Sequence, residues 1–194
     1  MEAAIGNKLT PWEERDRLGL FRGLLATLKA AAFSPRPFFA TLRAETPWIE
    51  SLWYGWLLQG VLGVLGTALY HVPIFAHVAQ PGSYVAWSLA PVVLYPVIVL
   101  LAGGLVHLLA LVTHGAHHGI TATLRAICYT GAAVVLLINL GPLGLWGLVI
   151  GVYALAGLQE MTVPRAALTL VGAGLLLTAA AVLPLGIYLG RHLP

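Results

Sequence analysis

Histidine and glutamate are the residues of this chain best suited to chemistry. His107, His114 and His118 share one helical face if the helix that contains His107 continues past residue 115. Imidazoles in such a cluster can bind a transition metal or respond to pH. Because carboxylates and thiolates are missing from the neighbouring sequence, we interpret residues 114–118 as a polar loop and expect no metal site.

Glu160 is the only acidic residue after residue 50, which makes its environment informative. Deep in lipid, a carboxylate costs about 3 kcal/mol and marks a functional position. At the end of a membrane span, a carboxylate needs only a neighbouring cation as its partner and no functional role. We therefore expect Glu160 to pair with Arg125 or Arg165, and we expect Arg125 to extend its charged head out to the membrane surface.

Catalytic motifs are missing from the sequence. It contains none of the patterns of serine hydrolases, zinc proteases, nucleotide-binding loops or dinucleotide-binding folds. One cysteine, Cys128, excludes an internal disulfide framework and a CxxC site. We expect neither enzyme activity nor a cofactor.

Composition shows what must hold these residues in place. The chain has 194 residues, of which 59% are hydrophobic and 9% charged, and its mean hydropathy is +0.89. A soluble domain carries far more charge, so lipid must surround most of the chain. Seven of the ten Lys and Arg residues and six of the seven acidic residues precede residue 51.

Five apolar stretches are candidates for membrane crossing. A bilayer core requires about 20 apolar residues of helix. The stretches are residues 51–70, 85–112, 122–138, 142–158 and 166–189. Proline and glycine separate them, as at Pro81, Gly115 and Pro142. The fourth stretch is short and rich in glycine, so a re-entrant course stays open for it.

The basic residues predict the orientation of this bundle. With five spans, nine of the ten fall on one side and only Arg191 falls on the other. Cations are retained on the cytoplasmic side. We expect a protein of the cytoplasmic (inner) membrane with its N-terminus in the cytoplasm and its C-terminus outside, and with residue 46 as the boundary between an N-terminal segment (1–46) and the membrane domain (47–194). No signal peptide is visible, so the first span is expected to direct insertion.

Residues 12–33 predict a basic amphipathic helix. Its apolar positions recur at helical spacing: Leu18, Phe21, Leu25, Leu28 and Ala32, widened by Leu20 and Leu24. Arg15, Arg22 and Lys29 recur every seven residues on the other side. The apolar face can lie in the membrane interface or pack on the protein's own cytoplasmic surface, and both can hold together.

A second short helix should follow, because Ser34 can cap it and Pro35 suits its first turn. We expect Arg15, Arg22, Lys29 and Arg36 to contact anionic lipid head groups. These positions explain the formal net charge of +3 without a nucleic-acid partner.

Three segments resemble the Yip family of multi-pass membrane proteins in its short bacterial form. They are residues 20–29 (LFRGLLATLK), 33–39 (FSPRPFF) and 122–129 (ATLRAICY). The resemblance extends from about residue 20 to the fifth span. It implies a cytosolic N-terminus, five helices and a C-terminus on the far side. Eukaryotic relatives bind Rab-type GTPases, but residues 52–56 (LWYGW) replace their Asp-Leu-Tyr-Gly-Pro pattern, which speaks against a GTPase partner here.

The sequence thus predicts an all-α, polytopic membrane bundle of about five transmembrane helices preceded by an amphipathic interfacial helix. Its function is expected to be non-enzymatic: organising the bilayer, or serving as a scaffold or accessory subunit of a membrane complex or homo-oligomer. The alternative is a small solute or ion permease that uses His107, Tyr95 and Glu160.

Overall fold

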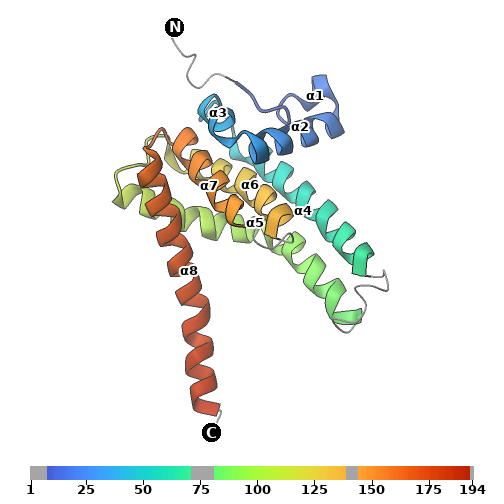
Figure 1. The fold of residues 1–194 in the computed structure, drawn as a ribbon, viewed down its shortest axis with the longest axis vertical. Coiled ribbons are helices and arrows are strands. Elements are labelled where there is room, and N and C mark those ends of the chain that lie inside the picture. Colours follow the sequence, from blue (N-terminus) through green and yellow to red (C-terminus); the bar gives the residue numbers. More distant parts are fainter. Residues whose placement is uncertain (1–7, 71–80, 139–143, 193–194) are drawn as a thin grey trace.

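The protein is described by a computed structural model. It describes the backbone of residues 8–70, 81–138 and 144–192, and the side chains of residues 8–61, 92–131, 145–180 and 182. Within these residues the chain is all-helical, with eight helices (Figure 1). This confirms the expected helical class. The break expected at Pro142 lies outside the described residues.

Three short helices form an N-terminal layer: α1 (Arg15–Leu18), α2 (Leu20–Phe33) and α3 (Pro35–Ala40). The prediction of one continuous helix over residues 12–33 was wrong, because the chain breaks at Gly19. Gly19 has φ 86° and ψ 147°, a conformation that a residue with a Cβ rarely adopts. The helix predicted after residue 34 is present with Pro35 in its first turn, although the Ser34 side chain forms no capping hydrogen bond.

Five longer helices follow, close to the five predicted stretches. They are α4 (Trp48–Tyr70), α5 (Pro81–Val112), α6 (Gly119–Ile138), α7 (Gly144–Leu158) and α8 (Val163–His192). Among the described residues, two stretches are long and apolar enough to cross a membrane: Val92–Val112 in α5 and Val163–Ala180 in α8. Helix α7 has 15 residues and is shorter than a full crossing requires.

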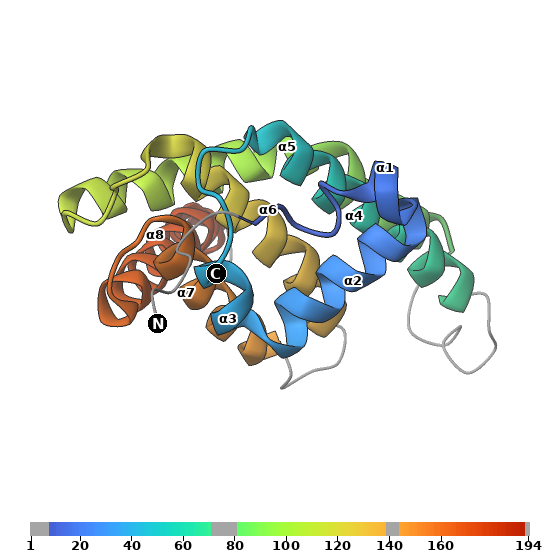
Figure 2. The same cartoon turned by 90° about the horizontal axis from the view of Figure 1, so that it is seen from above.

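Helix α6 lies at the centre of the bundle. It packs against α4, α5 and α7, and α8 packs against α5 and α7. The α4–α5 pair and α8 extend away from this centre in different directions, while the N-terminal layer lies across α4, α6 and α7 (Figures 1 and 2). The N-terminal layer is therefore part of the folded core and not a loose extension.

Small residues let the N-terminal layer approach the bundle closely. A Cβ added at Gly157 of α7 would lie 2.6 Å from the backbone carbonyl of Phe39 in α3. At α7's other end, the Trp146 indole donates a hydrogen bond to the Ala32 carbonyl of α2 at 2.7 Å. The end of α2 and α3 thus follow α7 for about 16 Å of its axis.

The loops that follow α5 and α7 meet at one end of the bundle. Both helices end in the same way, with a non-glycine residue of positive φ: His114 (53°) after α5 and Glu160 (52°) after α7. The next residue in each case donates its N–H five positions back, to Ala110 or Ala156, as in a Schellman motif. Gly115 packs on Met161, which brings the two helix ends together.

Candidate functional site at the junction of the N-terminal layer and the bundle

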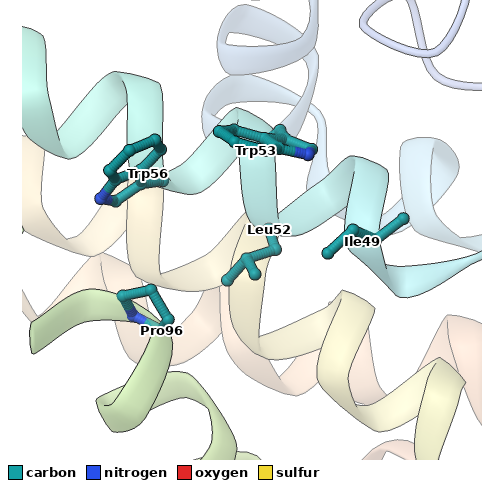
Figure 3. A pocket seen from close by; sticks show the side chains of 5 residues that line it. All are labelled: Ile49, Leu52, Trp53, Trp56 and Pro96. Carbon is teal, nitrogen blue, oxygen red and sulfur yellow. The ribbon is translucent and has the colours of Figure 1, made fainter.

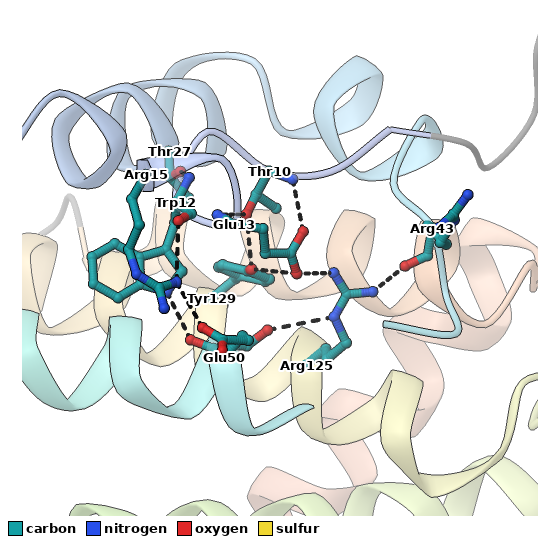
Figure 4. Close-up of polar contacts among 10 residues, drawn as sticks. Thr10, Trp12, Glu13, Arg15, Thr27, Arg43, Glu50, Arg125 and Tyr129 are labelled. Carbon is teal, nitrogen blue, oxygen red and sulfur yellow. Dashed lines mark hydrogen bonds and ion pairs between the residues drawn. The ribbon is translucent and has the colours of Figure 1, made fainter. Parts of the chain in front are cut away.

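A buried arginine joins the N-terminal layer to the centre of the bundle. The Arg125 side chain on α6 is fully buried, and its guanidinium lies 2.6 Å from Glu13 Oε1. The same guanidinium donates to the Arg43 carbonyl and, at 3.4 Å, to the Ser51 hydroxyl of α4 (Figure 4). The expectation that Arg125 extends to the membrane surface was wrong. A buried arginine must satisfy its donors inside the protein, and the N-terminal segment supplies the carboxylate.

Glu13 is held in place by the turn in which it lies. Its carboxylate accepts the Thr10 N–H at 2.8 Å, and its own N–H donates to the Thr10 hydroxyl at 3.1 Å. This reciprocal pair is a capping box, with Pro11 at the next position. The Tyr129 hydroxyl of α6 donates to Glu13 at 3.3 Å and lies 3.1 Å from the Thr10 hydroxyl. Local sequence therefore aims the carboxylate at α6.

Trp12 attaches the same turn to α2 and α4. It is buried, its indole N–H donates to the Glu50 carbonyl at 2.8 Å, and its backbone N–H donates to the Thr27 hydroxyl at 2.8 Å. The Arg15 guanidinium lies over the Trp12 ring and bonds Glu50 at 2.7 Å. The Arg15–Glu50 pair is about one-third exposed, unlike the Arg125–Glu13 pair. Two ion pairs of different burial thus fasten the layer.

The four cations expected to contact lipid fall into two groups. Arg15 is already engaged by Glu50, whereas Arg22, Lys29 and Arg36 are exposed.

Helix α2 docks through a face that only partly overlaps the predicted apolar face, which contributes Leu24 and Ala32. Gly23, Thr27 and Ala31 are buried together with Leu24, whereas Phe21 is 75% and Leu25 is 59% exposed. The small face docks because it allows close approach. Three of the seven predicted apolar residues, Leu20, Phe21 and Leu25, are exposed, and the last two lie beside Arg22 and Lys29.

The three histidines are separated by the end of α5. Helix α5 stops at Val112, so His107, His114 and His118 do not continue along one helical face. The imidazole Nδ1 of His107 lies 3.0 Å from the Thr123 hydroxyl of α6. Among the described residues no three His, Cys, Asp or Glu side chains are grouped to hold a metal ion.

Glu160 has a different partner from the one expected. Its Oε1 lies 3.2 Å from His118 Nε2, so the predicted pairing with Arg125 or Arg165 was wrong. The positive φ of Glu160 and the meeting of the α5 and α7 ends place it beside the loop before α6.

A buried glutamine, which the sequence reasoning did not single out, connects three elements. Gln159 donates to the Gly119 carbonyl and to the Thr123 hydroxyl, both at 2.7 Å, and accepts the His118 N–H at 2.8 Å. Its amide therefore caps the start of α6, where backbone groups lack helical partners. The sequence did contain a signal for this residue. Gln159 is an uncharged polar residue at the end of an apolar stretch, directly before Glu160, the only acidic residue after residue 50.

Tyr95, one of the three residues expected for a permease, lies apart from the other two. The Tyr95 hydroxyl donates to the Cys128 carbonyl at 3.2 Å, on a different part of α5 from His107. His107 and Glu160 are linked through Thr123, Gln159 and His118, and Tyr95 lies outside this chain of contacts.

The fold and this junction define a class of protein. It is a helical bundle that includes two helices long and apolar enough to cross a membrane, with an N-terminal layer of short helices fastened to it by a buried ion pair. No family model, no curated protein and no solved structure matches the chain.

Proposed function

We propose that the chain is a non-enzymatic, multi-pass protein of the cytoplasmic membrane, of the Yip type, in which α4 to α8 enter the bilayer. The N-terminal layer faces the cytoplasm and serves as the contact surface with anionic lipid head groups. Through this surface the protein organises the bilayer or acts as a scaffold in a membrane complex.

Exposed apolar side chains on the long helices support the membrane setting. In water such a continuous apolar surface is unfavourable, whereas hydrocarbon accepts it without cost. The large exposed residues on α5 and α8 include Val93, Leu101, Val112, Leu168 and Leu175. The buried positions between helices are often alanine, as membrane bundles favour for close packing: Ala110, Ala122, Ala126, Ala154 and Ala166.

The orientation rests on the distribution of cations. The N-terminal layer, the α5–α6 loop and the α7–α8 loop lie toward one end of the bundle, because Arg125 reaches Arg43 and His118 reaches Glu160. Nine of the ten basic residues belong to this part of the chain: Lys8, Arg15, Arg17, Arg22, Lys29, Arg36, Arg43, Arg125 and Arg165. The positive-inside rule makes this end cytoplasmic.

Helices α6 and α7 form a shallow pair in this arrangement. Trp146, in the first turn of α7, bonds the end of α2, so the start of α7 stays within reach of the N-terminal layer. With 15 residues, α7 does not cross the bilayer by itself. The two helices enter and return without a full crossing, so they leave the C-terminus outside.

One observation carries the lipid-contact function: α2 leaves Phe21 and Leu25 uncovered beside Arg22 and Lys29. Apolar side chains next to cations are the pattern of a helix that lies in the interface of an anionic membrane. The docked face of α2 holds the helix against the bundle, so the exposed side is presented in a fixed orientation. Arg125 donates inside the protein to Glu13, to the Arg43 carbonyl and to Ser51.

A fluorophore on α2 tests this function. Full-length protein with Phe21→Cys in a Cys128→Ala background is labelled with an environment-sensitive dye and reconstituted into liposomes. We expect the emission to shift to the blue with phosphatidylglycerol, and the shift to shrink at high salt or with Arg22→Glu and Lys29→Glu. The control label is at Glu45, exposed before α4. Equal emission from both labels at every lipid composition would refute the proposal.

A further inference from the structure

An apolar hollow lies between α4 and α5. One face of α4 supplies Ile49, Leu52, Trp53 and Trp56, and α5 supplies Pro96 (Figure 3). The α4 residues follow helical spacing of three and four, so they line one side of that helix. The hollow has a volume of about 160 Å³ and opens to the outside of the bundle.

Pro96 explains why the two helices leave this space. Proline lacks an N–H, so the Val92 carbonyl one turn earlier has no helical donor. The Trp56 indole N–H supplies the missing hydrogen bond at 2.8 Å. Helix α5 also changes direction along its length (Figure 1). The bond fixes the Trp56 ring as a wall, and the Trp53 ring packs on it with centroids 5.2 Å apart. The ring therefore cannot turn to fill the hollow.

The chemistry of the walls excludes most occupants. A trapped water requires two to four polar partners, but the lining side chains offer at most the Trp53 indole N–H, because the Trp56 N–H already donates to the Val92 carbonyl. A partner helix requires matching ridges and grooves over several turns, whereas the lining covers only two turns of α4. A narrow, flexible hydrocarbon chain needs neither polar partners nor a matching surface of several helical turns.

We infer that this hollow binds one acyl chain of a membrane phospholipid and retains it longer than the surrounding lipid. The inference rests on the proposed membrane function, which supplies the lipid. The tryptophans at the start of α4 place the hollow near the cytoplasmic head groups, where indole rings are preferred. The bound chain fills the notch at Pro96 and stiffens the contact between α4 and α5.

The test uses a lipid whose acyl chain carries a photoreactive diazirine. Full-length protein is loaded in bilayers of this phosphatidylcholine, transferred into bilayers of unlabelled phosphatidylcholine, and then illuminated. We expect the remaining cross-links to map to residues 49–56 and 96 by peptide mass spectrometry. Label on Val93 or Leu101, which are exposed on α5 outside the hollow, should be lost on transfer.

Two matched variants locate the retained chain. Ile49→Trp places a larger side chain at the mouth of the hollow, where Ile49 is 43% exposed, and should lose most of the retained label. Val97→Trp changes a neighbour of Pro96 that is 51% exposed and does not line the hollow, and should keep it. Protection of the buried Cys128 thiol verifies folding in both.

The outcomes separate this inference from the proposed function. Loss of all label on transfer, or equal retention in Ile49→Trp and the parent, would overturn the acyl-chain site while leaving the membrane setting intact. A protein dimer in native mass spectrometry that Ile49→Trp abolishes would mean that a second copy occupies the hollow. Absence of any cross-link before transfer would instead contradict the membrane setting itself.

Discussion

Replacing Glu13 by glutamine should strongly destabilise the protein, because Arg125 would lose its only carboxylate among the described residues. The pair is buried on both sides, with 0% of the arginine and 3% of the glutamate side chain exposed. Breaking such a pair by changing one partner costs about 3–5 kcal/mol. The adjacent residue is the control: Glu14 pairs with Arg17 at the surface, where the arginine side chain is 75% exposed. Glu14→Gln should cost less than about 1 kcal/mol.

The single cysteine provides the assay. Cys128 is buried next to the junction on α6, so a thiol-reactive fluorophore reports unfolding on heating. We expect the unfolding midpoint to fall by roughly 6–20 °C for Glu13→Gln and by only a few degrees for Glu14→Gln. The double variant Glu13→Gln with Arg125→Gln should lose less than the sum of the single losses, because it leaves no unpaired buried charge. Equal, small losses for Glu13→Gln and Glu14→Gln would refute the reasoning.

Three further perturbations test the packing of the helix ends and the course of α6 and α7 in the membrane. Gly157→Ala should loosen α3 from α7 and lower the unfolding midpoint, since its Cβ would meet Phe39 backbone atoms at 2.6 Å; Gly174→Ala, with nothing within 4 Å, should not. His114→Gly should raise the free energy of unfolding by about 1 kcal/mol, measured by denaturant titration, because glycine relieves the positive φ; a loss of stability would show that the imidazole has a structural role. A glycosylation acceptor inserted after residue 141 should remain unglycosylated under conditions in which domains on the far side of the membrane are glycosylated. The reason is that α6 and α7 are expected to return without a full crossing.

The helices themselves were largely predictable from the sequence. The five apolar stretches agree with α4 to α8 because glycine and proline mark their ends and because long apolar runs have few alternatives to a helix. The break at Gly19 was missed, since an isolated glycine within an amphipathic pattern is often tolerated. The face of α2 that docks was only partly predicted, because apolar pattern alone does not distinguish an interface with lipid from close packing through Gly23, Thr27 and Ala31.

The buried junction was only partly within reach of sequence reasoning. The capping box of Thr10 and Glu13 is a local signal and was available. Its pairing with Arg125, 112 positions away, depends on how α6 lies under the N-terminal layer. No local pattern encodes that placement, so the nearer cation–anion pair with Glu160 was predicted instead. The partner of Glu160 is His118, because the α5 and α7 ends meet in space.

Accessibility of single cysteines in intact cells tests the central claim most directly. In a Cys128→Ala background, a single cysteine replaces Glu45, replaces Glu160 or is added after residue 194. Each of the three proteins is treated with a membrane-impermeant maleimide. We predict that the first two react only after the membrane is opened and that the C-terminal one reacts in intact cells. Reaction of all three cysteines in intact cells, or of none of them in intact cells, would contradict a bilayer-embedded bundle with its N-terminal layer in the cytoplasm.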